Sequence, residues 1–323
     1  MRRLMRRPHR DEKGVVVVLM AAFVMGIVGM AALVVDVGTV LDEKRQLQTG
    51  ADAAALGLAQ HLGRTCPVTA TAACTASLQS RADELAKANA RDGFAKVEAP
   101  TSDHTTRQVT VRTSTLDGGT GTILPYSFGQ ALTGVEGKTV HASATASWGP
   151  VGRAPVMRLA ILQCDFVRLG FSTVESTIVF HSESACGGGP GLDAPGNFGW
   201  LEDDSDGDAC ELTVSANQVA GGRPGNSPAL ADCVGAYLNE DILLPVSDDI
   251  VGVTGPGGNA VYTVKGFARF HLTAYRFGPK GSPGPDPCSG ATNCIKGYFV
   301  RYVMPSGVIG GTEFGVSTVK LVS

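Results

Sequence analysis

Three aspartates close together are the clearest candidates for metal chemistry in this sequence. Asp204, Asp206 and Asp208 occupy alternate positions of one short acidic run. Carboxylate oxygens at this spacing suit Ca²⁺, a hard cation that proteins bind through oxygen ligands. The run lacks the glutamate that completes an EF-hand loop, because Ser215 stands at the twelfth position counted from Asp204. The alternative is a solvated acidic turn between strands, which is the usual role of such a run.

Eight cysteines form the second group of residues that could take part in covalent or metal chemistry. Their number is even, and spaced cysteines outside a cell more often form disulfides than metal sites. The sequence predicts two local pairs that each close a short loop, Cys66–Cys74 and Cys288–Cys294, and leaves the pairing of the others within the β-rich part open. A zinc site is disfavoured because no Cys-x2-Cys spacing occurs. The eight are Cys66, Cys74, Cys164, Cys186, Cys210, Cys233, Cys288 and Cys294.

Signatures of common enzyme classes are missing from the sequence. It contains no Gly-x-Ser-x-Gly and no His-Glu-x2-His motif, and its six histidines are scattered. Gly137-Lys138-Thr139 resembles the end of a phosphate-binding loop, but Leu132 stands where that loop requires glycine. We therefore expect a protein that is not an enzyme and uses no cofactor apart from the Ca²⁺ candidate.

Positions 14–35 form a run of 22 residues without any charge. As a helix it would span about 33 Å, enough to cross a hydrocarbon core of about 30 Å. Residues 1–13 hold six Lys or Arg and two acidic residues, whereas the rest of the chain is net negative. Because basic flanks stay in the cytoplasm, we expect a cytoplasmic arm at 1–13, a single transmembrane helix at 14–35 and an extracytoplasmic remainder held at the cytoplasmic membrane. A cleaved signal is disfavoured, since its core has roughly 7 to 15 residues.

Helical periodicity continues beyond the apolar run. A helix to about residue 62 would project about 40 Å from the bilayer. Gly50 disfavours helix by about 1 kcal/mol relative to Ala and predicts a bend there. One side is rich in small residues, which allow another helix to approach closely; this side is either part of a plain stalk or an assembly surface, and composition alone favours the stalk. The apolar residues that recur at helical spacing are Leu47, Ala51, Ala54, Leu58 and Leu62.

The span is followed by an ordered series of short motifs. They are Asp36-x-Gly38, Arg45-Gln46-Leu47-Gln48 and Ala51-Asp52-Ala53-Ala54-Ala55-Leu56. In this order and spacing, residues 13–60 resemble the N-terminal domain of the Flp pilus-assembly TadG-like and TadE-like proteins. The sequence departs from that family at Thr49-Gly50, where the family usually carries Asn-Ala.

The resemblance implies a single-pass envelope protein associated with a tight-adherence pilus apparatus. It implies pilus or secretion-apparatus proteins as partners and no catalytic residues. Prepilin-type cleavage stays open, because Lys13-Gly14 precedes the run but Leu19 stands where substrates commonly carry Glu. The candidate residues for an assembly surface are Asp36, Gly38, Gln46, Gln48, Ala51, Asp52 and Ala55.

The remainder of the chain predicts a mostly β structure. A second helix is expected at 76–92, bridged to the first by Cys66–Cys74, so that 36–95 form a helical stalk or hairpin. Alternating strands at 108–113 and 139–148 indicate a small β region at 96–150, and 149–155 read as a linker. Short strands separated by Gly, Pro and Asn predict a disulfide-bonded sandwich or small barrel at 151–323. They are expected at 176–181, 211–214, 241–246, 261–277 and 296–304.

The sequence thus predicts an α+β protein with an N-terminal transmembrane helix, a helical stalk and a β-rich extracytoplasmic domain. Its expected function is a non-enzymatic role in pilus assembly or surface adhesion, with no nucleic-acid partner. The alternative is an anchored β domain that binds a glycan, wall polymer or small ligand through a loop at Phe198 and Trp200.

Overall fold

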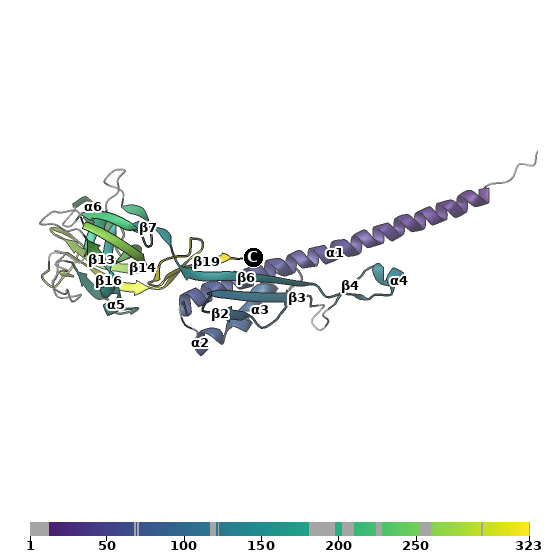
Figure 1. Cartoon of the computed structure of the whole chain (residues 1–323), viewed down its shortest axis with the longest axis horizontal. Helices are drawn as coiled ribbons and strands as arrows, with labels where there is room; N and C mark the ends of the chain where they lie inside the picture. Colours follow the sequence, from purple (N-terminus) through teal and green to yellow (C-terminus); the bar gives the residue numbers. More distant parts are fainter. Residues whose placement is uncertain are drawn as a thin grey trace, which may run out of the picture. The chain divides into compact units, whose positions relative to one another are not determined.

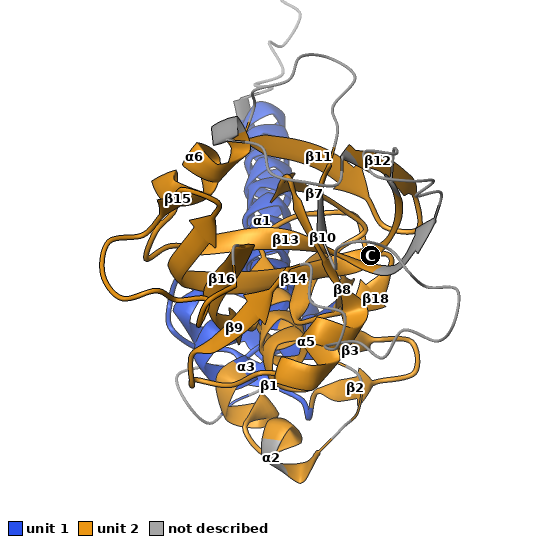
Figure 2. Cartoon of the chain, turned by 90° about the vertical axis from the view of Figure 1, so that its left-hand side faces the viewer, with its two compact units in different colours: residues 1–54, 82–99, 111–144 blue, residues 55–81, 100–110, 145–323 orange. Residues whose placement is uncertain are grey.

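The computed structural model confirms the α+β architecture, with a long N-terminal helix followed by β-rich structure (Figure 1). The chain forms two compact units (Figure 2). The first comprises residues 1–54, 82–99 and 111–144, and the second comprises residues 55–81, 100–110 and 145–323. The domain boundaries expected from the sequence stay predictions. The residues that the structure describes are 13–67, 69, 71–116, 121, 123–180, 198–201, 210–223, 228–251, 260–291 and 293–322.

Helix α1 (Lys13–Thr65) is continuous and changes its surroundings along its length. In the apolar run its large side chains are exposed, as at Val15, Phe23 and Val34, which expose 63%, 66% and 68% of their surface. Farther on, the chain itself buries the apolar face, and Leu47 and Leu58 are at most 2% exposed. Within the described residues, α1 is the one helix long and apolar enough to cross a membrane. The helix runs through Gly50 without interruption.

Short elements of the first unit accompany α1. Strand β1 pairs antiparallel with β3, with Val97 opposite Thr113. Beyond this pair, Thr115 N–H donates to Val140 O, and Val140 N–H donates to the Thr115 hydroxyl, both at 3.0 Å. The predicted helix and two strands of this part are confirmed within a few residues. The elements that lie wholly or partly in this unit, besides α1, are α3 (Leu78–Ala88), β1 (Lys96–Val97), β3 (Gln108–Ser114), β4 (Leu124–Pro125), α4 (Gly129–Thr133), β5 (Gly137–Lys138) and β6 (His141–Pro150).

The second unit is built on one large sheet in the order β12-β10-β8-β13-β14-β16-β9. Strand β12 also pairs with β14, so β12, β10, β8, β13 and β14 close into a ring. The sequence predicts a sandwich or small barrel, and this ring is the barrel form. The bounds are α2 (Ala72–Thr75), β2 (Thr101–Asp103), β7 (Arg153–Met157), β8 (Leu159–Leu162), α5 (Gln163–Leu169), β9 (Ser176–Val179), β10 (Phe198–Leu201), β11 (Glu211–Ser215), β12 (Val219–Arg223), α6 (Pro228–Ala236), β13 (Asp241–Val251), β14 (Ala260–Phe277), β15 (Lys280–Gly281), β16 (Asn293–Val300), β17 (Tyr302–Met304), β18 (Thr312–Glu313) and β19 (Val316–Leu321).

An aromatic core fills this unit. The ring of Phe166, from α5, lies 4.9 Å from Phe299 and 5.1 Å from Phe314, with edge-on geometry in both cases. Helix α6 adds Leu230 and Val234 to the same cluster. Edge-to-face pairs of this kind contribute about 0.5–1.5 kcal/mol each beyond the burial of their area. The two helices, which the sequence analysis did not predict, therefore complete the core of the β structure.

Residues 149–155 differ from the predicted linker. They contain the end of β6 and the start of β7, and Val151 is buried. The Gly152 N–H donates to Val308 O at 2.6 Å, and Gly310 N–H donates to Pro150 O at 2.8 Å. The Gly and Pro residues here allow close backbone packing between two chain segments, a use that composition alone does not distinguish from a flexible linker.

The two predicted local disulfides are confirmed. Cys66 bonds Cys74 and Cys288 bonds Cys294. A third bridge joins Cys210 to Cys233 in α6, and no described cysteine is free. Cys186 lies outside the described residues.

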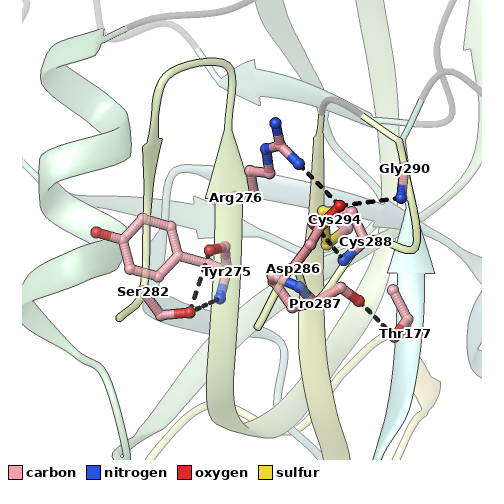
Figure 3. A network of polar contacts seen from close by, with 9 residues as sticks. All are labelled: Thr177, Tyr275, Arg276, Ser282, Asp286, Pro287, Cys288, Gly290 and Cys294. Atoms are coloured by element: carbon pink, nitrogen blue, oxygen red, sulfur yellow. Dashed lines mark hydrogen bonds and ion pairs between the residues drawn. A yellow bond between two sulfur atoms is a disulfide. The ribbon is translucent and has the colours of Figure 1, made fainter. Parts of the chain in front are cut away.

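The Pro-rich loop before Cys288 is held by the carboxylate of Asp286 (Figure 3). It accepts hydrogen bonds from the N–H groups of Cys288 and Gly290, both at 3.0 Å, and forms an ion pair with Arg276 at 2.9 Å. The Cys288 N–H, followed by Gly290 N–H and Arg276, holds the pKa of Asp286 below its usual range. The loop is thereby fixed to strand β14 beside the Cys288–Cys294 bridge.

The lengths of the disulfide loops predict different costs of removal. Cys210–Cys233 spans 23 residues and Cys288–Cys294 spans 6. By loop-closure entropy the bridges stabilise the fold by about 3.4 and about 2.2 kcal/mol respectively. The Cys210→Ala/Cys233→Ala variant should therefore lose about 1 kcal/mol more stability than Cys288→Ala/Cys294→Ala. Urea unfolding of the detergent-solubilised chain, followed by the fluorescence of buried Trp148 and Trp200, tests this order, and a reversed order would contradict it.

Candidate assembly surface

The seven candidate assembly residues all lie on α1 but differ in exposure. Asp36, Ala51 and Ala55 are buried, and the last two have no exposed surface. Gly38 is exposed, whereas Gln46, Gln48 and Asp52 are half-buried. The chain's own elements therefore cover much of this set, and the contacts of each residue show how.

Asp36 binds three consecutive backbone N–H groups. Its carboxylate accepts hydrogen bonds from Ser127 N at 2.8 Å, from Phe128 N at 3.2 Å and from Gly129 N. These groups lie at the N-terminal end of α4, where free N–H groups and the helix dipole favour a negative charge. The first charged residue after the apolar run thus holds the segment that contains β4, α4 and β5.

Gln46 joins α1 to the segment that follows α3. Its side-chain oxygen accepts a hydrogen bond from Arg91 N at 2.9 Å, and its nitrogen donates to Asp42 at 3.0 Å. The Arg91 side chain forms an ion pair with Asp42 at 3.1 Å. Because both charged groups are substantially exposed, the ion pair adds little stability, and the backbone hydrogen bond to Gln46 is the more specific link.

Gln48 makes the corresponding link to β6. Its nitrogen donates to Asp52 at 2.8 Å and to the carbonyl oxygen of Ser143 at 3.1 Å. At the preceding residue of α1, the buried Thr113 hydroxyl donates to Leu47 O at 3.0 Å. These bonds hold β3 and β6 against α1 in the first unit.

The small-residue face of α1 packs against α3 in the first unit. A Cβ atom at Gly50 would lie 3.1 Å from the carbonyl oxygen of Ala86, closer than most Cβ contacts. Ala82 and Ala86 of α3 have no exposed surface, like Ala51 of α1. The glycine that the sequence analysis associates with a bend therefore permits a close helix crossing.

A polar cleft of about 360 Å³ opens beside Gln48 in the first unit. Three of its side chains are basic or can become so, namely Lys44, Arg112 and His141, against one acidic residue, Glu98. Such a cleft can accept acidic or hydrogen-bonding side chains of a partner.

On the same stretch of α1, burial and then the charge of Asp92 raise the pKa of Glu43, while a hydrogen bond from Thr115 opposes that rise.

A second groove, of about 190 Å³, lies in the second unit and was not predicted. The Asp241 carboxylate is 2.9 Å from Arg269 Nε and 2.6 Å from His271 Nδ1. Arg269 also stacks on the ring of Tyr302 at 3.9 Å. Arg269 and His271 alternate along β14, but sequence alone does not place Asp241 and Tyr302 beside them.

The loop proposed to bind a ligand through Phe198 and Trp200 is a strand. Trp200 lies in β10, is 2% exposed, and its ring is 5.1 Å from that of Phe277 in the core. An indole buried in this way cannot stack on a glycan, so the expectation for Trp200 is corrected. An aromatic residue next to Gly and Asn is compatible with either a loop or a core strand.

The Ca²⁺ candidates Asp204, Asp206 and Asp208 lie outside the described residues, and that site stays a prediction. In the part of the chain that the structure describes, no group of three or more His, Cys, Asp or Glu residues could hold a metal ion.

Helix α1 thus has an exposed apolar run long enough to cross a membrane and a later part whose apolar face the chain buries, and a disulfide-bonded, β-rich domain follows it. Comparison with protein families matches residues 14–60 to the Flp pilus-assembly TadE/G-like family (Tad). This match confirms the resemblance of the N-terminal segment and indicates a context in pilus assembly. No curated protein and no solved structure matches the chain.

The close crossing at Gly50 predicts opposite effects of two matched substitutions in α1. Gly38→Ala, with nothing within 4 Å of the added Cβ, should stabilise the helix by up to about 1 kcal/mol. Gly50→Ala should be net destabilising, because overpacking costs about 1–3 kcal/mol. Compared with the unchanged full chain, hydrogen exchange of the α3 amides should be faster in Gly50→Ala and not faster in Gly38→Ala. Slower exchange in Gly50→Ala would refute the close crossing.

Proposed function

We propose that this chain is a non-enzymatic, membrane-anchored component of Flp/Tad-type pilus assembly or surface adhesion machinery. The observation that carries the proposal is that a single helix contains both the Tad-type match and an exposed apolar run long enough to cross a membrane. The partners are pilus or secretion-apparatus proteins, which contact the chain outside the lipid.

We place the N-terminus in the cytoplasm and the bulk of the chain outside it. Six Lys or Arg in residues 1–13 support this orientation, since basic flanks stay inside. The three described disulfides also support it, because such bonds persist in oxidising compartments.

In this proposal the Tad-type segment acts as a scaffold. Asp36, Gln46 and Gln48 bind backbone groups of the first unit, so they shape a surface for partners. Exposed positions among these residues of α1 include Lys44, Arg45 and Thr49, and Lys44 also lines the polar cleft. We propose no cofactor for this role. The alternative, a ligand-binding β domain, would need a site other than the buried Trp200.

The proposal predicts which positions crosslink to the apparatus. A photo-crosslinking residue at Arg45 or Thr49 in living cells should capture pilus-apparatus proteins, because both side chains are exposed on the matched segment. Val174, which is 69% exposed in the second unit, provides a control position that should not give these adducts. Deletion of the chain should also abolish surface fibres. The proposal would be rejected if the crosslinked products were the same in cells that lack the apparatus and if deletion of the chain left the surface fibres normal.

A further inference from the structure

The hairpin formed by residues 123–138, here called the α4 hairpin, exposes several apolar side chains. Ile123, Phe128 and Val135 expose 44%, 51% and 51% of their surface. The hairpin consists of paired strands β4 and β5 with α4 between them, and Leu124 lies opposite Lys138. Three large apolar side chains exposed within 16 residues make this segment a candidate for contact with a membrane.

The Asp36 carboxylate fixes this hairpin to a defined level of α1. Asp36 directly follows Val35, the last residue of the apolar run. It binds the backbone N–H groups of Ser127, Phe128 and Gly129. Because these are backbone contacts, Phe128 lies beside the end of the run, where a spanning helix leaves the hydrocarbon core.

The backbone of the α4 hairpin suits a surrounding of low polarity. Tyr126 N–H donates to Glu136 O at 3.0 Å, Ala131 N–H to Phe128 O at 3.1 Å and Gly134 N–H to Gln130 O at 2.8 Å. Internal bonds of this kind matter near lipid, because an unsatisfied N–H group is costly there. Aromatic rings and apolar side chains close to charged residues are typical of segments at the membrane interface.

We propose that the α4 hairpin lies in the membrane interface where α1 leaves the bilayer, with Ile123, Phe128 and Val135 among the lipid headgroups and the first acyl carbons. The exposed Glu136 and Lys138 then face headgroups and water. The inference rests on the proposed span of α1 and goes beyond it, since it gives the chain a second contact with the same leaflet. This contact would restrict the tilt of α1 and orient the first unit relative to the membrane.

The test uses the full chain in phosphatidylcholine/phosphatidylglycerol vesicles with or without lipids brominated near the top of the acyl chains. Phe128→Trp places an indole in the hairpin, while native Trp148 and Trp200 are buried and give a common background. Phe94→Trp is the matched control. Phe94 is 40% exposed and lies near Arg91, which binds Gln46, ten residues and about 15 Å farther along α1 than Asp36.

Bromolipid should quench the additional emission of Phe128→Trp at least about twofold more than that of Phe94→Trp, because apolar interfacial side chains reach the acyl boundary. Gly129→Ala, added to Phe128→Trp, should reduce this difference. Its Cβ would lie 2.7 Å from the Asp36 carboxylate and disturb the attachment.

Equal quenching of both variants in chain that floats with the vesicles would overturn the hairpin proposal and leave the span intact. Chain that fails to float would overturn both the span and the hairpin contact. A third outcome is tryptophan emission at position 128 that bromolipid does not quench but that shifts to shorter wavelength as the protein concentration rises. It would mean that a second copy covers the hairpin, which also overturns the proposal.

Discussion

The carboxylate of Asp36 directly follows the exposed apolar run of α1 and precedes the part of the helix that packs against the rest of the chain. Before it, large apolar side chains are exposed; from Leu47 onward, the chain buries its own apolar face. A buried charge between these regions needs hydrogen-bond partners, since desolvation without them is costly. The N–H groups of Ser127, Phe128 and Gly129 supply them. This interaction thus fixes the position of the segment that contains β4, α4 and β5 along the helix, directly after the apolar run.

Residues of the Tad-type segment hold other parts of the same chain in place. Gln46 and Gln48 bind backbone groups of the segments that follow α3 and form β6. Gly50 lies on the face that meets α3. Residues that a sequence comparison associates with assembly therefore build the chain's own fold first. A partner would then recognise the surface that they organise, with the exposed positions of α1 and the polar cleft as its accessible parts.

Local patterns predicted much of this fold, and long-range pairing limited the rest. The apolar run, the strand segments and the two short disulfide loops depend on neighbouring residues, so composition and spacing sufficed. Ring closure through β12 and β14 and the Cys210–Cys233 bridge join distant segments, which one sequence does not specify. The same limit explains the sites. The sequence marks Asp36 only as part of a motif and does not predict its contacts with residues 127–129. It likewise suggests an exposed Trp200, whereas the structure places the ring against Phe277 in the core.

We propose that α1 crosses the membrane and holds a disulfide-bonded domain outside the cytoplasm. In-cell thiol alkylation tests it most directly: cells are quenched with acid, and the full chain is treated with a maleimide polymer before or after reduction. We expect no mass shift without a reductant and a shift after reduction, because every cysteine lies beyond the span and oxidising compartments preserve disulfides. Full modification without a reductant would show reduced cysteines, as in the cytoplasm, and would contradict the claim.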